Sequence, residues 1–92
     1  MAHTVRDKKK LLNRVRRIQG QVEAIAKALE AEADCTVTLR TIASARGAIN
    51  GLMAEVIDGH VRYHVADPDQ QPNSERSRAV RDLLDIVKAY LR

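Results

Sequence analysis

The sequence has 92 residues, which allows one domain with a modest core, and it contains no Phe or Trp and only two Tyr. Its formal net charge is +4, yet residues 1–20 carry seven basic side chains and one acidic one, a local charge of +6. One cysteine excludes an internal disulfide framework, and no apolar run approaches the ~20 residues of a membrane span. With no apolar leader at the N-terminus, we expect a soluble, cytoplasmic protein with no membrane partner.

The N-terminal third predicts a short arm and one long helix. Apolar residues recur at alternating intervals of four and three, at Leu11, Val15, Ile18, Val22, Ile25 and Leu29. This spacing places them in one narrow seam along a helix. We therefore expect an arm over residues 1–6 and a helix over about 5–31.

A second long helix is predicted over about 35–65, where Asp34 is placed to cap its N-terminus. Its seam has heptad spacing and consists of Ile42, Ala45, Ile49, Leu52, Val56, Gly59 and Tyr63. Residues 66–77, which include two prolines, have the composition of a loop. A third, shorter amphipathic helix is predicted over about 78–92 from Val80, Leu83, Leu84, Val87, Tyr90 and Leu91.

These patterns predict an all-α fold, with one domain spanning residues 1–92 and a protomer of three helices that are long, long and short. Helices with narrow apolar seams bury those seams by association. We expect two helical hairpins to pair as an antiparallel dimer, with the third helix packing across it. Two dimers would then form a dimer-of-dimers tetramer.

Three residues point to metal chemistry. His60 and His64 lie four apart, so on a helix their imidazoles share one face and can reach one metal ion. Cys35 is the sole thiol, and the helix predicted between it and His60 rises ~1.5 Å per residue, which separates the two groups by roughly 37 Å. If all three side chains bind one ion, the thiol must come from another, antiparallel copy of the chain.

The arm adds His3 as a fourth candidate ligand, next to the amine that Ala2 exposes once Met1 is removed. One sulfur with several nitrogens disfavours Cu(I) and suits Zn(II), Co(II) or Ni(II). Recruiting the arm raises the coordination number, which favours Co(II) or Ni(II) over Zn(II). An arm that binds only when metal arrives couples binding to a conformational change, which indicates a sensor more than an enzyme.

Two segments of the sequence resemble a known family. Residues 14–22 (RVRRIQGQV) and 42–53 (IASARGAINGLM) look like the first- and second-helix motifs of the CsoR/RcnR family of bacterial metal- and formaldehyde-responsive transcriptional repressors. The resemblance covers nearly the full chain and is closest to the nickel- and cobalt-sensing RcnR branch. That branch carries a histidine at the third position, a cysteine at the start of helix two and a His-x-x-x-His near its end. These features match His3, Cys35, His60 and His64.

The resemblance implies a disc-shaped tetramer that binds operator DNA when metal-free and releases it when metal binds, so that an efflux gene is expressed. It also implies that Cys35 of one protomer meets His60 and His64 of another. Copper sensors of the family have a second cysteine where this chain has His64, so Cu(I) sensing is not expected. Formaldehyde sensors, the FrmR branch, usually carry a proline after the initiator Met. The primary amine of Ala2 can still be bridged by formaldehyde to Cys35, so this branch is the alternative.

We expect double-stranded operator DNA to bind a basic face of the oligomer, because no helix-turn-helix, zinc-finger or basic-zipper pattern is present. One face of the first helix carries four basic residues, Arg6, Lys10, Arg14 and Arg17. This face is flanked by Lys8, Lys9 and Arg16, and it is extended from the second helix by Arg46. Phosphate contacts from these residues would make affinity fall steeply with salt.

Two other classes of function are disfavoured. Nothing in the sequence builds a substrate pocket or an oxyanion hole around the thiol, so we expect no enzyme and no small organic substrate apart from formaldehyde. A metal-buffering helical protein without a DNA partner does not explain the charge of the first 20 residues.

Overall fold

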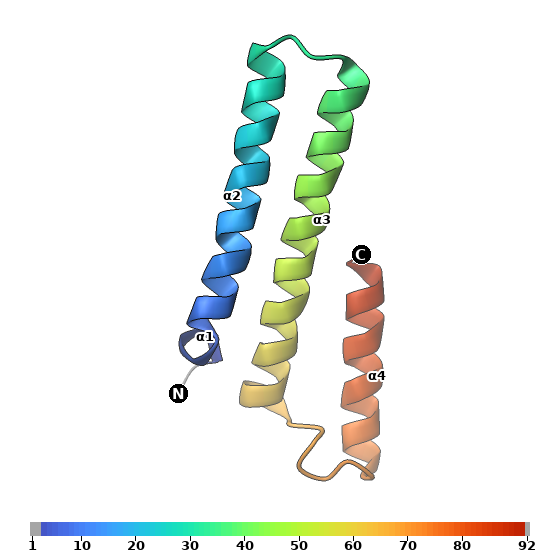
Figure 1. The fold of residues 1–92 in the computed structure, drawn as a ribbon. Coiled ribbons are helices and arrows are strands. Elements are labelled where there is room, and N and C mark those ends of the chain that lie inside the picture. Colours follow the sequence, from blue (N-terminus) through green and yellow to red (C-terminus); the bar gives the residue numbers. More distant parts are fainter. Residues whose placement is uncertain (1–2, 92) are drawn as a thin grey trace.

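The structure, a computed structural model, describes residues 3–91, with the backbone alone for residues 3 and 4. Two long antiparallel helices lie side by side, and a shorter helix packs beside the second half of the second one (Figure 1). In chain order the elements are α1 (His3–Arg6), α2 (Lys8–Glu30), α3 (Cys35–His60), the π-helical turn η1 (Val61–Val65) and α4 (Glu75–Tyr90). No strand occurs within residues 3–91, and the predicted all-α fold with two long helices and one short helix is confirmed.

The first helix is interrupted at Asp7, whereas the apolar spacing predicted a continuous helix from about residue 5. Asp7 has φ −98° and ψ 16°, and its carbonyl accepts a hydrogen bond from the amide of Leu11 at 2.9 Å. A residue in this capping position starts the bonding of one helix while its own dihedral angles leave the helical range. The described part of the expected arm is therefore a separate helical turn, α1, that points in a different direction from α2 (Figure 1).

A four-residue turn, residues 31–34, joins α2 to α3. The amides of residues 32 and 33 donate back to carbonyls in the last turn of α2, and Glu32 takes a left-handed φ of 52°. Asp34 then caps α3 by accepting a hydrogen bond from the amide of Thr36 at 3.4 Å, which confirms the predicted cap. Such a short connection leaves the two helices only the antiparallel arrangement.

The second long helix continues through η1 without a break, so one helical rod runs from Cys35 to Val65 and spans the residues expected for it. In η1 the amide of Ala66 donates to the carbonyl of Val61 at 2.8 Å, five residues back, which widens the last turn. Ala66 has an extended backbone, and the buried Pro68 follows it. The chain therefore leaves the helix here.

The last helix, α4, begins at Glu75, three residues before its predicted start. Ser74 is its cap, because the Ser74 hydroxyl accepts a hydrogen bond from the amide of Ser77 at 3.1 Å. The preceding loop is correspondingly shorter than the expected 66–77. Arg81 donates to the carbonyl of Pro68 at 3.3 Å and keeps this loop against α4.

The protomer is a single layer of helices. Its extents are 55 × 25 × 13 Å, and the smallest is close to the ~10–12 Å diameter of one helix with its side chains. Among the described residues, the buried apolar side chains include Leu84 and, of the seam residues, Ala45, whereas other seam residues such as Leu29 (63% exposed) and Ile42 (43% exposed) are open to solvent. None of the described helices combines the length and apolarity that crossing a membrane requires. The exposed seams therefore need another protein surface to cover them.

An ion-pair network fastens α4 and the loop to the second helix. Asp58 lies 2.8 Å from Arg62 Nε and 2.9 Å from Lys88 Nζ, and Arg62 Nη1 lies 3.0 Å from Asp69. Burial alone raises the pKa of Asp58, but the hydrogen bonds and charges of Lys88 and Arg62 outweigh it and hold that pKa below its ordinary value. The ionised carboxylate therefore stabilises the folded protein at neutral pH, and this stabilisation disappears as the pH falls through the lowered pKa.

We expect Leu84→Ala to lower the free energy of unfolding by about 2–4 kcal/mol, because Leu84 is 2% exposed and its loss leaves a cavity between α4 and its neighbours. Urea unfolding at a fixed protomer concentration measures this. The matched control is Asp85→Ala on the exposed side of α4, which should change the free energy of unfolding by less than about 1 kcal/mol. Equal effects of the two substitutions would contradict the packing of α4.

We expect Asp58→Asn to destabilise the protein at neutral pH, and the difference from wild type to shrink as the pH falls from about 4 through the lowered pKa of Asp58, because the wild-type carboxyl then becomes neutral as well. Urea unfolding at a series of pH values measures both curves. Asp82, exposed on α4 and without a basic partner among the described residues, supplies Asp82→Asn as the control. If the difference in free energy of unfolding between wild type and Asp58→Asn stays constant down to low pH, the charge of Asp58 does not contribute to stability.

Candidate functional site

His60 and His64 are brought together at one end of the molecule. His60 ends α3 and His64 lies within η1, and their ring centroids are 5.2 Å apart with a tilt of 36°. Both side chains are exposed. Two neutral imidazoles at this separation, on a surface that another molecule can approach, suit shared coordination of one transition-metal ion.

Cys35 lies at the opposite end of the same rod. It is the first residue of α3, its thiol is exposed, and at ~1.5 Å per residue it is roughly 37 Å from His60. In the part of the chain that the structure describes, no group of three or more His, Cys, Asp or Glu side chains is placed to hold a metal. Ala2 and the side chain of His3 lie outside the described residues. One chain therefore brings together two of the four predicted ligands.

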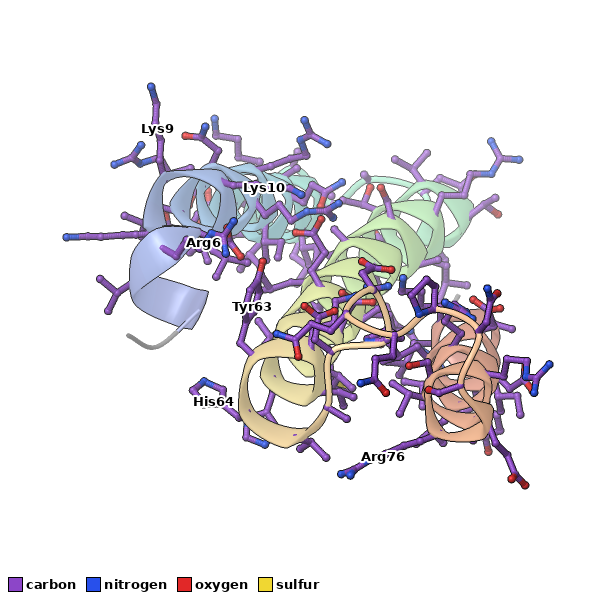
Figure 2. All side chains as sticks on the ribbon, turned by 90° about the horizontal axis from the view of Figure 1, so that it is seen from below. Arg6, Lys9, Lys10, Tyr63, His64 and Arg76 are labelled. Carbon is purple, nitrogen blue, oxygen red and sulfur yellow. The ribbon has the colours of Figure 1, made fainter. Side chains whose placement is uncertain are left out.

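The start of the chain contacts the histidine end through Arg6. The Arg6 guanidinium lies over the ring of Tyr63, with 4.9 Å from Cζ to the ring centroid, which is a cation–π contact. Figure 2 shows Arg6, Tyr63 and His64 gathered at this end. Tyr63 belongs to the same turn as His64, so the contact joins α1 to the segment that carries the imidazoles. The sequence pattern assigned Arg6 to DNA and Tyr63 to the apolar seam, and it missed their contact.

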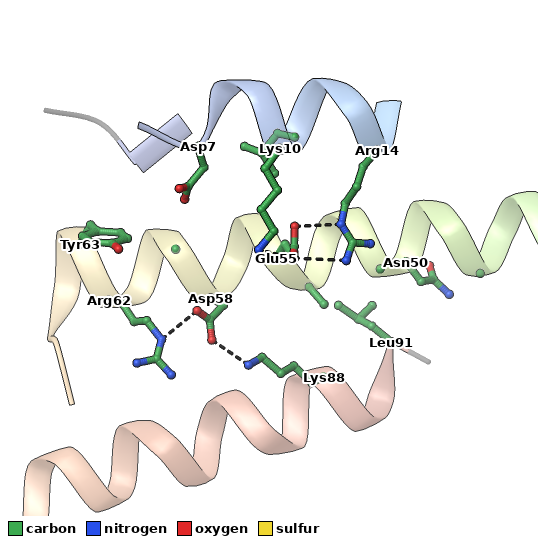
Figure 3. Close-up of a pocket in the computed structure, with 15 residues that line it drawn as sticks. Asp7, Lys10, Arg14, Asn50, Glu55, Asp58, Arg62, Tyr63, Lys88 and Leu91 are labelled. Atoms are coloured by element: carbon green, nitrogen blue, oxygen red, sulfur yellow. Dashed lines mark hydrogen bonds and ion pairs between the residues drawn. The ribbon is translucent and has the colours of Figure 1, made fainter. Parts of the chain in front are cut away.

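Two residues of the predicted basic face are paired with one carboxylate. Glu55 on α3 lies 3.1 Å from Lys10 Nζ and 2.9 Å from Arg14 Nε, and Arg14 Nη2 also donates to it at 3.3 Å. We call this arrangement the Glu55 clamp (Figure 3). Gly51 makes room for it, since a Cβ added there would lie 3.2 Å from Arg14 Nη1. Glu55 was missed because its partners are 41 and 45 residues away in the sequence.

The remaining basic candidates have no acidic partner within ion-pair distance among the described residues. Exposed on the surface are Lys8, Lys9, Arg16, Arg17 and Arg46. Lys9 points away from the other helices (Figure 2). Arg46 instead borders a shallow, largely apolar groove between α2 and α3 of about 270 Å³. The structure thus groups Arg46 with the exposed seams and not with the clamp.

A cleft of about 630 Å³ lies between α2, α3 and α4. Both ion-pair systems line it, the Glu55 clamp on the α2 side and Asp58 with Lys88 on the α4 side (Figure 3). Each of the two carboxylates is shared by two basic side chains, Glu55 by Lys10 and Arg14 and Asp58 by Arg62 and Lys88, so the cleft is a junction that joins the helices more than a substrate pocket.

Comparison with known proteins identifies the family to which the chain belongs. A family model described as metal-sensitive transcriptional repressor matches residues 7–89. The chain is 49% identical over 92 residues to an uncharacterized protein in the bioA 5′ region of Serratia marcescens and 41% identical over 92 residues to the transcriptional repressor RcnR of Salmonella paratyphi B, covering all of each chain.

The comparison with solved structures extends the agreement to the fold. A glutamate-to-histidine variant of the formaldehyde-responsive regulator FrmR from Salmonella enterica serovar Typhimurium is 43% identical, with a TM-score of 0.63 over 92% of this chain and 94% of that one. The resemblance found in residues 14–22 and 42–53 is confirmed. The chain belongs to the CsoR/RcnR family of metal-sensitive transcriptional repressors, which are DNA-binding regulators and not enzymes.

Proposed function

We propose that this protein is a cytoplasmic repressor that binds operator DNA in the effector-free state and is released when Ni(II) or Co(II) binds between subunits, which derepresses a metal efflux gene. Cys35 of one copy and His60 and His64 of another would hold the ion. The observation that carries this proposal is the placement of the imidazole pair and the sole thiol at opposite ends of one continuous rod.

Antiparallel pairing of two protomers would bring each thiol to the other protomer's imidazole pair. The exposed seams supply the surface for such pairing, since apolar side chains on both α2 and α3 are open in the single chain. The two seams run over residues 11–29 and 42–63 of the hairpin, with the heptad spacing of coiled coils. A two-fold axis then gives two equivalent sites per dimer, and a dimer of dimers gives four.

The donor set fits a borderline transition metal. One thiolate and two imidazoles make three ligands, and His3 with the N-terminal amine would raise the number toward that preferred by Ni(II) or Co(II), with Zn(II) the other candidate. The Arg6–Tyr63 contact supports recruitment of the N-terminal segment, because it holds α1 beside the turn that carries His64. Ordering of this segment would alter the start of α2, where the basic residues begin.

Formaldehyde is the alternative effector. The Ala2 amine and the Cys35 thiol would add one molecule of formaldehyde and lose one molecule of water to form an N–CH₂–S bridge. Two observations favour keeping this candidate. The Cys35 thiol is exposed, and the FrmR variant of similar fold is described as formaldehyde-responsive.

A single DNA-release series separates the two effectors. DNA flanking the protein's own gene is labelled, and anisotropy is followed with Ni(II), Co(II), Zn(II), Cu(I) or formaldehyde. We expect Ni(II) and Co(II) to weaken binding by about 5- to 150-fold, the usual range for coupled sites. Changing both His60 and His64 to Ala should abolish release by metal, while Cys35→Ser should abolish release by either effector. Release by formaldehyde alone would establish the alternative.

Subunit mixing tests whether the site lies between protomers. A Cys35→Ser chain and a chain with both histidines changed to Ala each lack a complete site. When the two are unfolded together and refolded, half of the dimers should be mixed and each should regain one intact site. We expect about a quarter of the wild-type Co(II)–thiolate absorbance to return. No recovery, in a mixture shown by mass spectrometry to contain mixed dimers, would contradict the inter-subunit site.

A further inference from the structure

We propose that Glu55 is an internal counter-anion that competes with DNA phosphate for Arg14 and Lys10, and so limits the affinity of the basic face. This inference rests on the proposed function, because it concerns how that face binds DNA. It assigns a role to an acidic residue on α3 in the effector-free state, independently of which effector the protein senses.

Arg14 is the more tightly engaged partner of the clamp. Its Nε lies 2.9 Å from one carboxylate oxygen of Glu55 and its Nη2 donates to the other at 3.3 Å, so one edge of the guanidinium faces the carboxylate. The third nitrogen, Nη1, lies against Gly51. A phosphate binds a guanidinium best through two parallel N–H groups, and because Nη1 lies against Gly51 we expect phosphate to compete with Glu55 for the Nε–Nη2 edge.

Lys10 is held more loosely. Its side chain is 68% exposed, against 39% for Arg14, and its ammonium group has three donors, of which the contact with Glu55 at 3.1 Å uses one. Lys10 can therefore reach a phosphate without leaving the carboxylate. Glu55 itself is 26% exposed, so solvent screens its charge only in part. Competition between Glu55 and phosphate should therefore affect mainly Arg14.

Arg17 is the reference for a basic residue without this competitor. It lies one turn further along α2, is exposed, and has no acidic partner among the described residues. The sequence pattern placed Arg14 and Arg17 on the same face and made them equivalent contacts. The clamp makes them unequal, because DNA must displace a carboxylate at Arg14 and only water and counterions at Arg17.

The test compares Glu55→Gln with Glu23→Gln, effector-free, by anisotropy on a random-sequence duplex over a series of salt concentrations. Glu23 is exposed on α2 without a basic partner among the described residues, so both substitutions raise the charge equally. We expect Glu55→Gln to tighten binding about tenfold at 0.1 M salt and to steepen the salt slope by about one for each protomer on the DNA. Glu23→Gln should tighten binding less and leave the slope unchanged. Equal behaviour of the two variants, or weaker binding by Glu55→Gln, would overturn the inference.

A second comparison asks whether Glu55 makes Arg14 and Arg17 unequal. In the wild-type background, Arg14→Gln should weaken DNA binding clearly less than Arg17→Gln does. In the Glu55→Gln background the two arginine substitutions should become similar. If Arg14→Gln is as damaging as Arg17→Gln with Glu55 intact, Arg14 is already available to DNA and the clamp does not compete.

These measurements are separable from those that test the effector. A protein that Ni(II), Co(II) and formaldehyde all fail to release, but in which Glu55→Gln steepens the salt slope, would refute the proposed sensing and support the clamp. If metal releases the protein from DNA but Glu55→Gln and Glu23→Gln bind DNA alike, the proposed sensing is supported and the role of the clamp is refuted. If none of the variants binds duplex DNA even at low salt, both proposals fail.

Discussion

The rigidity of the helix from Cys35 to Val65 is the constraint on which the rest of the molecule depends. Backbone hydrogen bonds fix the rise per residue, so a chain of this kind cannot fold back to bring its two ends together. No proline interrupts the rod, and the widened turn η1 occurs only at its last residues. Chemistry that needs groups from both ends therefore needs two molecules. In the function proposed above, effector binding would therefore act directly on the contact between subunits.

Two carboxylates of the same helix, those of Glu55 and Asp58, attach it to the neighbouring helices. Glu55 faces α2 and Asp58 faces α4, and both lie in the half of the rod nearer the histidines. The start of α2, α1 and α4 are thus all attached to this half, whereas the half that begins with Cys35 carries the hairpin turn and open apolar surface. Arg6, Lys10 and Arg14 consequently share the histidine end of the protomer with the imidazole pair. An event at the imidazoles needs to travel only about two helical turns to reach Glu55.

Much of the fold could be predicted because its signals are local. The alternating intervals of four and three identify the helices, and Asp34 caps α3 with an atom only two residues from its partner amide. The helix starts were less predictable. Asp7 lies in a run of basic residues that suits a continuous helix, and Ser74 lies in a polar segment where a capping serine resembles any other loop residue.

The site could be predicted only where it depends on distance along a helix. The separation of Cys35 from His60 follows from the number of residues between them, and so does the approach of His60 to His64. The partners of Glu55 depend instead on how α2 is rotated against α3, which the turn and the close contact at Gly51 determine. In the proposed site, the groups that face Cys35 belong to another molecule, and no periodicity within one chain specifies them.

The turn between the two long helices has a consequence for how the protein can evolve. Glu32 occupies a left-handed backbone position that glycine adopts without steric conflict, and a side chain there is disfavoured by roughly 1–2 kcal/mol. The hairpin nevertheless forms, so the protein operates below the stability that its own topology permits. A single substitution of Glu32 by glycine should remove this conformational cost, and it could offset a destabilising change elsewhere in the protein.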